Sequence, residues 1–164
     1  MTPSAPNIHG TLVALGDRGV LVTGESGSGK TELALALLSH WRAQRRFARM
    51  VCDDQVFLAP HDGRLVGRAP ASIAGLVEAR GYGIVSIPHE PAAIIDLVVD
   101  LVAAEQVARM AEPAMAVIAG ISLPLLRQTR RDIARALMAV AAVLGAPPFG
   151  SPGNWPFGRG PVAD

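Results

Sequence analysis

The sequence predicts an α/β fold with a mixed sheet, and three observations lead to it. Residues 24–31, Gly-Glu-Ser-Gly-Ser-Gly-Lys-Thr, match the pattern G-x-x-x-x-G-K-[ST] of a P-loop at every fixed position. A β-branched apolar run at 19–23 comes before the loop, and the helix-forming run 32–38, free of Gly and Pro, comes after it. A short Gly-Asp turn joins residues 9–15 to the strand at 19–23, which implies an antiparallel pair. Together they predict a P-loop nucleotide-binding domain.

The loop carries the strongest chemical signal. Lys30 is the only lysine in the chain, against fourteen arginines, and it stands where a P-loop uses lysine to contact phosphates. The glycines let backbone N–H groups face an anion, and the N-terminus of the following helix adds partial positive charge. A Gly/Ser-rich turn that matches by chance is the alternative. We therefore predict a site for ATP or GTP with Mg²⁺, in which Thr31 binds the metal. Its residues are Gly24, Glu25, Ser26, Gly27, Ser28, Gly29, Lys30 and Thr31.

The rest of the chain alternates between strand and helix patterns. The helix after the loop is expected to run to about Arg45. Strands are expected at residues 49–52, 55–58, 64–67, 84–87, 94–101 and 116–121. Residues 94–101 also fit a helix. Residues 129–144 show apolar side chains at helical spacing, which predicts a second long helix. Residues 145–164 contain five prolines and five glycines, so we expect a flexible tail after a catalytic domain at 1–144.

Composition restricts the class of protein. A chain of 164 residues fits one domain with its own core, and the lone Cys52 cannot form a disulfide within it. The net charge of +1 is scattered along the chain, so we expect no nucleic-acid partner. Asp96 and Asp100 interrupt the longest apolar stretches, and residues 1–6 lack the pattern of a signal peptide. We expect no membrane partner and a cytoplasmic location.

Two further groups of charged residues are candidates for chemistry. Asp53 and Asp54 follow an apolar strand downstream of the loop, where a carboxylate can bind a metal or accept a proton from an attacking hydroxyl. A capped turn is the alternative for this pair. Glu78 and Arg80 stand two residues apart on an expected extended segment, so both would project from one face and could hold Mg²⁺ and a phosphate oxygen. An ordinary surface ion pair is the alternative there.

Taken in order, these segments resemble the catalytic domain of the bacterial HPr kinase/phosphorylase family. The matching runs are His9-Gly10, residues 24–32, residues 51–56 and residues 78–85, and the similarity covers about residues 7 to 102. The chain resembles a short, alphaproteobacterial-type form of the family. The resemblance implies a mixed sheet related to phosphoenolpyruvate carboxykinase-like folds. It also implies an ATP-dependent protein-serine kinase that acts on HPr or an HPr-like phosphocarrier of the phosphotransferase system, and a homo-oligomer, since the family is hexameric.

The resemblance also implies roles for single residues. Lys30 would bind the β- and γ-phosphates, Thr31 and Glu78 would hold magnesium, and Arg80 would belong to the catalytic set. Asp53 is favoured as the base that accepts the serine proton, with Asp54 hydrogen-bonded to His9, although the sequence does not separate the two acids.

One part of the family pattern has no clear counterpart in this chain. The arginine- and proline-rich stretch that the family uses for phosphorolysis is not matched, and none of Arg127, Arg130 and Arg131 aligns with it. We therefore expect kinase activity to exceed phosphorylase activity. The competing function is a nucleotide-dependent regulatory switch that hydrolyses ATP slowly. The acidic residues at 53, 54 and 78 favour the kinase, because transfer to a protein hydroxyl needs a base within reach.

Overall fold

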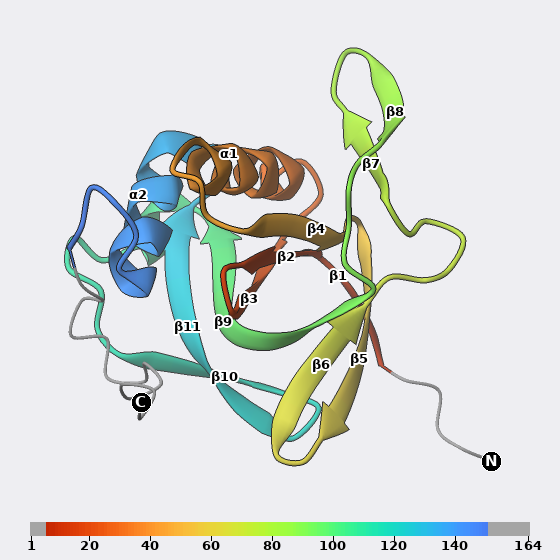
Figure 1. Cartoon of the computed structure of the whole chain (residues 1–164). Coiled ribbons are helices and arrows are strands. Elements are labelled where there is room, and N and C mark those ends of the chain that lie inside the picture. Colours follow the sequence, from red (N-terminus) through yellow and green to blue (C-terminus); the bar gives the residue numbers. More distant parts are fainter. Residues whose placement is uncertain (1–5, 151–164) are drawn as a thin grey trace.

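The computed structural model describes residues 6–150, and its centre is a curled, mixed sheet of nine strands (Figure 1). Residues 6–150 hold eleven strands: β1 (Asn7–His9), β2 (Thr11–Leu15), β3 (Arg18–Gly24), β4 (Ala48–Cys52), β5 (Gln55–His61), β6 (Arg64–Arg68), β7 (Leu76–Ala79), β8 (Gly83–Ser86), β9 (Ala92–Val102), β10 (Ala114–Ile118) and β11 (Ile121–Thr129). The helices are α1 (Lys30–Ala43) and α2 (Ile133–Leu144), with a short 3₁₀ helix at Ala104–Gln106. Strands β7 and β8 form a separate two-stranded sheet.

Strand β9 organises the sheet. The order runs β1-β5-β6-β9-β3-β2-β4. The first half of β9 pairs antiparallel with β6 and its second half pairs parallel with β11, while β3 lies parallel along it as well. The strands come very close near Gly19, where a Cβ would collide with the carbonyl oxygen of Ile94. Because β3 and β9 pair in parallel, the start of the loop at residue 24 lies beside the end of β9.

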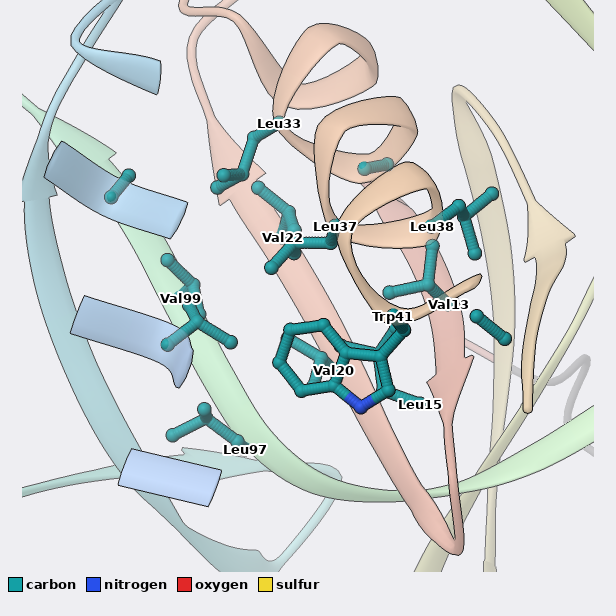
Figure 2. Packing of buried hydrophobic residues seen from close by; sticks show 14 of the residues in the cluster. Val13, Leu15, Val20, Val22, Leu33, Leu37, Leu38, Trp41, Leu97 and Val99 are labelled. Atoms are coloured by element: carbon teal, nitrogen blue, oxygen red, sulfur yellow. The ribbon is translucent and has the colours of Figure 1, made fainter. Parts of the chain in front are cut away.

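The two faces of the sheet bury two separate apolar clusters, because alternate side chains of a strand point to opposite faces. One cluster lies between the sheet and the helices; it includes Val20, Val22, Val99, Leu33 and Trp41 (Figure 2). The other lies inside the curl of the sheet. It includes Leu12, Leu21, Val56, Leu58, Leu65, Ile95 and Val98. Helix α1, which follows the loop, is therefore anchored by packing along its length.

Most of the predicted elements are present. Strands β2 and β3 form the predicted antiparallel hairpin, which confirms the mixed sheet. The segment at 94–101 is the strand β9 rather than a helix. The run at 9–15, however, is split at Gly10: β1 pairs with β5, whereas β2 pairs with β3 and β4. The Gly10 N–H donates to the Asp54 carbonyl at 3.1 Å, so the split brings β1 beside the two acids.

Three predicted boundaries are wrong. Residues 116–121 are not one strand, because Ala119 and Gly120, both with positive φ, form the turn between β10 and β11. Alanine rarely occupies such a turn, so the sequence pattern gives no indication that a turn lies here. The second helix begins at Ile133 rather than residue 129, since β11 runs to Thr129 and the Asp132 side chain caps the helix by accepting from the Arg135 N–H. Arg80 lies in the turn after β7, so Glu78 and Arg80 do not share one extended strand.

The segment after α2 differs in part from the expected flexible tail. Ala146 is fully buried, and the Pro147 carbonyl lies 2.8 Å from Nε2 of His40 on α1. Residues 145–147 therefore pack against the domain, while residues 148–150 are exposed. Residues 151–164 lie outside the described part of the chain, and the division at residue 144 stays a prediction. Neither helix in residues 6–150 has the length and apolar character needed to cross a membrane.

Candidate active site

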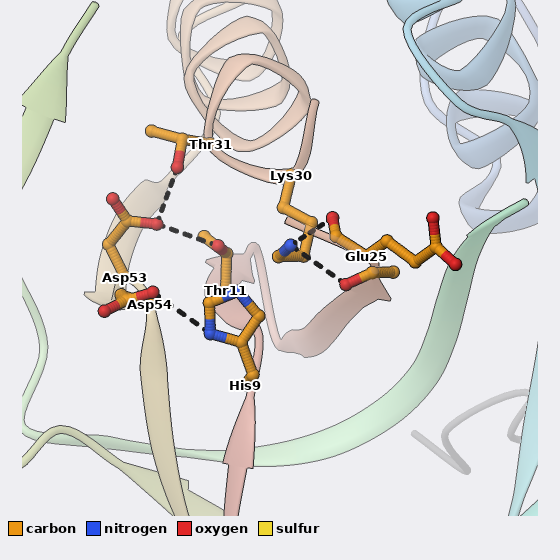
Figure 3. Close-up of polar contacts among 8 residues, drawn as sticks. His9, Thr11, Glu25, Lys30, Thr31, Asp53 and Asp54 are labelled. Atoms are coloured by element: carbon orange, nitrogen blue, oxygen red, sulfur yellow. Dashed lines mark hydrogen bonds and ion pairs between the residues drawn. The ribbon is translucent and has the colours of Figure 1, made fainter. Parts of the chain in front are cut away.

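The glycine-rich loop, residues 24–29, connects β3 to α1 and is shaped by backbone conformations that glycine adopts without strain. Gly24, Gly27 and Gly29 have φ values of 147°, 75° and 100°. The Lys30 ammonium folds back over the loop and donates to the carbonyl oxygens of Gly24 at 2.9 Å and Glu25 at 2.8 Å (Figure 3). These bonds draw loop carbonyls toward the lysine.

The N–H groups of the loop are left largely without acceptors. The Ser28 N–H donates to the Glu25 carbonyl at 3.1 Å, but within residues 6–150 no acceptor is found for the N–H groups of Gly27, Gly29 and Lys30. The Ser28 hydroxyl is buried and also has no hydrogen-bond partner among the described residues. Helix α1 begins at Lys30 with no side-chain cap. Unpaired N–H groups at a helix N-terminus form a site that favours an anion.

Asp53, at the end of β4, is buried beside the loop. Its side chain is 8 % exposed, and Oδ1 accepts from the hydroxyl of Thr11 at 2.8 Å and that of Thr31 at 2.9 Å. Thr11 begins β2 and Thr31 belongs to the first turn of α1, so the carboxylate ties the sheet to the helix that follows the loop (Figure 3). The Thr31 hydroxyl keeps its oxygen lone pairs for another ligand, because it acts as the donor in this bond.

Asp54 lies in a different environment. Its backbone is left-handed, with φ of 72°, and its side chain is 67 % exposed. Oδ1 lies 3.1 Å from Nδ1 of His9, which is itself half exposed. The strained backbone turns Asp54 away from its neighbour Asp53, so the two adjacent acids face different partners. This arrangement brings together the His9–Asp54 pair that the sequence suggested.

The β7–β8 hairpin carries the remaining candidates. Nε of Arg80 lies 3.8 Å from Oε1 of Glu32 in the first turn of α1, and both side chains are substantially exposed. Glu78 is exposed on β7. One cavity of about 330 Å³ joins the hairpin to the loop and the acids. Predicted site residues that line it are His9, Ser26, Gly27, Gly29, Lys30, Thr31, Asp53, Asp54, Glu78 and Arg80.

Three predicted residues do not line this cavity: Gly24, Glu25 and Ser28. Other residues were missed. No sequence pattern marks Thr11, which donates to Asp53, as a site residue. Glu32, however, directly follows the loop motif, so its position could have been used to predict it. Apolar side chains also line the cavity, among them Ile73, Leu76 and Ile84. The Arg131 side chain donates to the Gly27 carbonyl, a contact across 104 residues that no local pattern could reveal.

Burial changes the ionisation of two groups near the site. Desolvation lowers the pKa of Lys30 below its ordinary value of 10.5, and the carboxylates of Asp54, Asp53 and Glu32 offset part of that effect. Burial raises the pKa of the Cys52 thiol, next to Asp53, to about 12. Cys52 is therefore an inert core residue.

The donors suited to a cation here are oxygen atoms: the Thr31 hydroxyl and the carboxylates of Asp53 and Glu78. Within residues 6–150, no three His, Cys, Asp or Glu side chains cluster tightly enough to hold a metal ion. Mg²⁺ is usually held by one or two protein oxygens together with waters and substrate phosphates, and does not require such a cluster.

Comparisons with known proteins agree on the family. Residues 2–125 match the model of the HPr Serine kinase C-terminal domain. HPr kinase/phosphorylase of Clostridium beijerinckii is 44% identical over 80 residues, which cover 49% of this chain and 24% of the relative. The protein of the same name from Clostridium tetani is 42% identical over 81 residues, covering 49% and 25%. These alignments thus span about a quarter of the length of the curated relatives.

A solved structure shares the fold. The chain superposes on the Hpr(Ser) kinase/phosphatase from Coxiella burnetii with a TM-score of 0.70 and 23% sequence identity, covering 85% of this chain and 88% of that one. The likeness extends to the curled mixed sheet. Because the family model covers more than half of the sequence, and a solved member of like name has the same fold, the chain belongs to the HPr serine kinase C-terminal domain family.

Proposed function

We propose that this chain is an ATP-dependent protein-serine kinase that phosphorylates HPr or an HPr-like phosphocarrier of the phosphotransferase system. One observation carries the proposal. A single cavity is lined by the loop with unpaired N–H groups, by the Lys30 ammonium and by the His9–Asp54 pair. An anion site and a group able to accept a proton therefore lie together, as phosphoryl transfer to a hydroxyl requires.

The residues present fit a nucleotide with magnesium. The unpaired N–H groups of Gly27 and Gly29 and the orphaned Ser28 hydroxyl supply donors that phosphate oxygens would satisfy. Thr31 and Glu78 would hold Mg²⁺, with Asp53 orienting the Thr31 hydroxyl through their 2.9 Å hydrogen bond. The cation, when bound, neutralises charge on the phosphate oxygens. Lys30 would release the carbonyls of Gly24 and Glu25 and turn to the phosphates.

The environments of the two acids suggest different roles for them. Asp53 is buried and its Oδ1 already accepts two hydroxyl protons, which suits an orienting group. Asp54 is exposed to the cavity and has His9 as its partner. Although Asp53 was our choice from the family resemblance, we now favour Asp54 as the base. The serine oxygen would bond to the γ-phosphorus as the bond to the leaving ADP oxygen breaks, and the serine proton would pass to Asp54.

Other parts of the proposal rest on the family. Arg80, which lines the cavity, would stabilise negative charge on the transferring group. The phosphocarrier acceptor, a homo-oligomeric state and a cytoplasmic location rest on family membership alone. The expectation that kinase activity exceeds phosphorolysis rests on the unmatched arginine-rich stretch. A regulatory switch would need a residue that positions the attacking water and mobile loops, whereas a kinase needs a base within reach of a protein hydroxyl. The exposed Asp54 of the His9–Asp54 pair favours the kinase.

The deciding experiment combines labelled ATP, Mg²⁺ and purified HPr-like carrier proteins with this chain. We expect label on one serine of the carrier, located by mapping the modified peptide. A carrier whose serine is replaced by alanine is the matched control and should stay unlabelled. ATP hydrolysis with no labelled protein would contradict kinase activity and favour the switch.

A further inference from the structure

The turn after β11 lies against the outside of the glycine-rich loop. The backbone N–H of Arg131 donates to the Ser28 carbonyl at 2.9 Å, and its Nε donates to the Gly27 carbonyl, also at 2.9 Å. The neighbouring Arg130 contacts only a side chain of the loop, with Nη1 3.4 Å from Oε2 of Glu25. Arg131 thus holds two successive carbonyl groups of the loop.

These two bonds fix the orientation of N–H groups in the loop. In a trans peptide the C=O and the following N–H point in opposite directions. Holding the Gly27 and Ser28 carbonyls therefore sets the directions of the N–H groups of Ser28 and Gly29. The Ser28 N–H meets the Glu25 carbonyl at 3.1 Å, whereas the Gly29 N–H finds no acceptor within residues 6–150. Gly29 lines the cavity, so its N–H is kept available there.

The surrounding structure holds the backbone of Arg131 in an unfavourable conformation. Its φ is 63°, a left-handed conformation that glycine adopts without strain and arginine does not. The turn also packs closely on the loop: a Cβ at Gly29 would lie 3.0 Å from Cδ1 of Ile133 and 3.6 Å from the Arg131 nitrogen. Arg131 is not among the residues that line the cavity, so it acts on the loop and not on a ligand inside the cavity.

From these contacts we infer that Arg131 is a positioning residue for phosphate binding, an inference that rests on the proposed function. Its Nε and backbone N–H hold the Gly27 and Ser28 carbonyls on the outer side of the loop. The Gly29 N–H then points where a phosphate oxygen of the nucleotide can accept from it. The backbone N–H of Arg131 directs the Gly29 N–H through the Ser28 carbonyl, while the guanidinium, as a hydrogen-bond donor, holds the preceding peptide through the Gly27 carbonyl, and its charge is secondary.

The test uses substitutions at Arg131 that separate the donor, the charge and the backbone strain. R131G removes the side chain and relieves the positive φ. R131Q places an amide nitrogen at the position of Nε, one bond beyond Cδ, and removes the charge. R130A removes an equal charge from the same turn without touching the loop backbone. Each variant is titrated with ATP and Mg²⁺ in a calorimeter, and its melting temperature is measured without nucleotide.

We expect R131G to bind ATP about tenfold more weakly, the effect of roughly one hydrogen bond, with an unchanged or higher melting temperature. R131Q and R130A should stay within about threefold of the wild-type affinity. If R131G bound as tightly as the wild type, the inference would be overturned while the proposed function stood. Equal losses in R131Q or R130A would show that charge matters, and would overturn it too. A wild-type chain that binds no ATP overturns both the function and the inference.

Discussion

The glycine-rich loop and the β7–β8 hairpin line the same cavity but are held in different ways. The loop runs from β3, which has β2 on one side and β9 on the other, into α1, whose inner face is buried. The hairpin strands pair only with each other, and its side chains Tyr82 and Ile84 are 84% and 72% exposed. The comparison teaches that the loop wall is packed along its length, whereas the hairpin is anchored at its base by the buried Val77 and leaves its tip and Arg80 exposed. Substitutions in the two walls should therefore separate binding from stability.

The largest effect is expected on the packed wall, for Lys30→Ala. Phosphoryl transfer should be lost, because the variant lacks the ammonium that we propose binds the β- and γ-phosphates. The melting temperature should change little, since burial already works against the charged form of Lys30. Label transferred from ATP and a thermal melt measure the two effects. Arg64→Ala, an exposed cation on β6, is the control, and transfer retained by Lys30→Ala would contradict the prediction.

The two acids beside that wall sharpen the comparison further. Asp54→Asn should bind ATP normally but transfer phosphate about 10²–10⁴-fold more slowly, the usual result of removing a positioned base. Asp53→Asn should also lower the melting temperature, because Asp53 is buried and accepts from Thr11 and Thr31. Calorimetric titration with ATP and steady-state transfer rates distinguish the variants. Slow transfer in Asp53→Asn alone, with Asp54→Asn unaffected, would restore Asp53 as the base.

Substitution in the hairpin tests the second wall. Arg80→Ala should slow transfer by about ten- to a hundredfold, the effect of a lost charge-assisted hydrogen bond. The melting temperature should fall by no more than about 4 °C, because an exposed ion pair contributes at most about 1 kcal/mol. The double variant with Glu32→Gln measures the coupling across the 3.8 Å contact. A fall in melting temperature as large as that of Asp53→Asn would contradict the small contribution expected of this exposed contact.

The smallest effect is a dependence on pH. Because the pKa of Lys30 is lowered by burial, the free protein loses the lysine charge at a pH below 10.5. If the charged form binds phosphate as proposed, ATP affinity should fall as the pH rises through the lowered pKa of Lys30. The same shift means that the native state binds fewer protons than the unfolded chain, so the Lys30 contribution to stability rises with pH up to about 10.5. ATP titrations from pH 7 to 10 measure the first effect. The Lys30→Arg variant keeps its positive charge over this range, so its ATP affinity should not fall as the pH rises.

The two walls were also unequally predictable from the sequence. The loop, its strand and α1 follow each other along the chain, so the motif and the local propensities sufficed. The meeting of Asp53 with Thr11 and Thr31 depends on the curl of the sheet, which no local pattern specifies. Ala119 in a hairpin turn and Arg131 in a left-handed turn contradict residue preferences, and the surrounding contacts decide both conformations.

Strand β9 has a consequence for the order in which the molecule can fold. Thr23, immediately before the loop, bonds to Asp100 across 77 residues, and β3 lies parallel to β9 over most of its length. During synthesis the loop is complete by residue 31, yet one flank of its strand stays open until β9 emerges from the ribosome. Pairings of such long sequence separation form slowly, because a large chain loop must close first. The nascent chain therefore displays its glycine-rich loop long before the loop can hold its final shape.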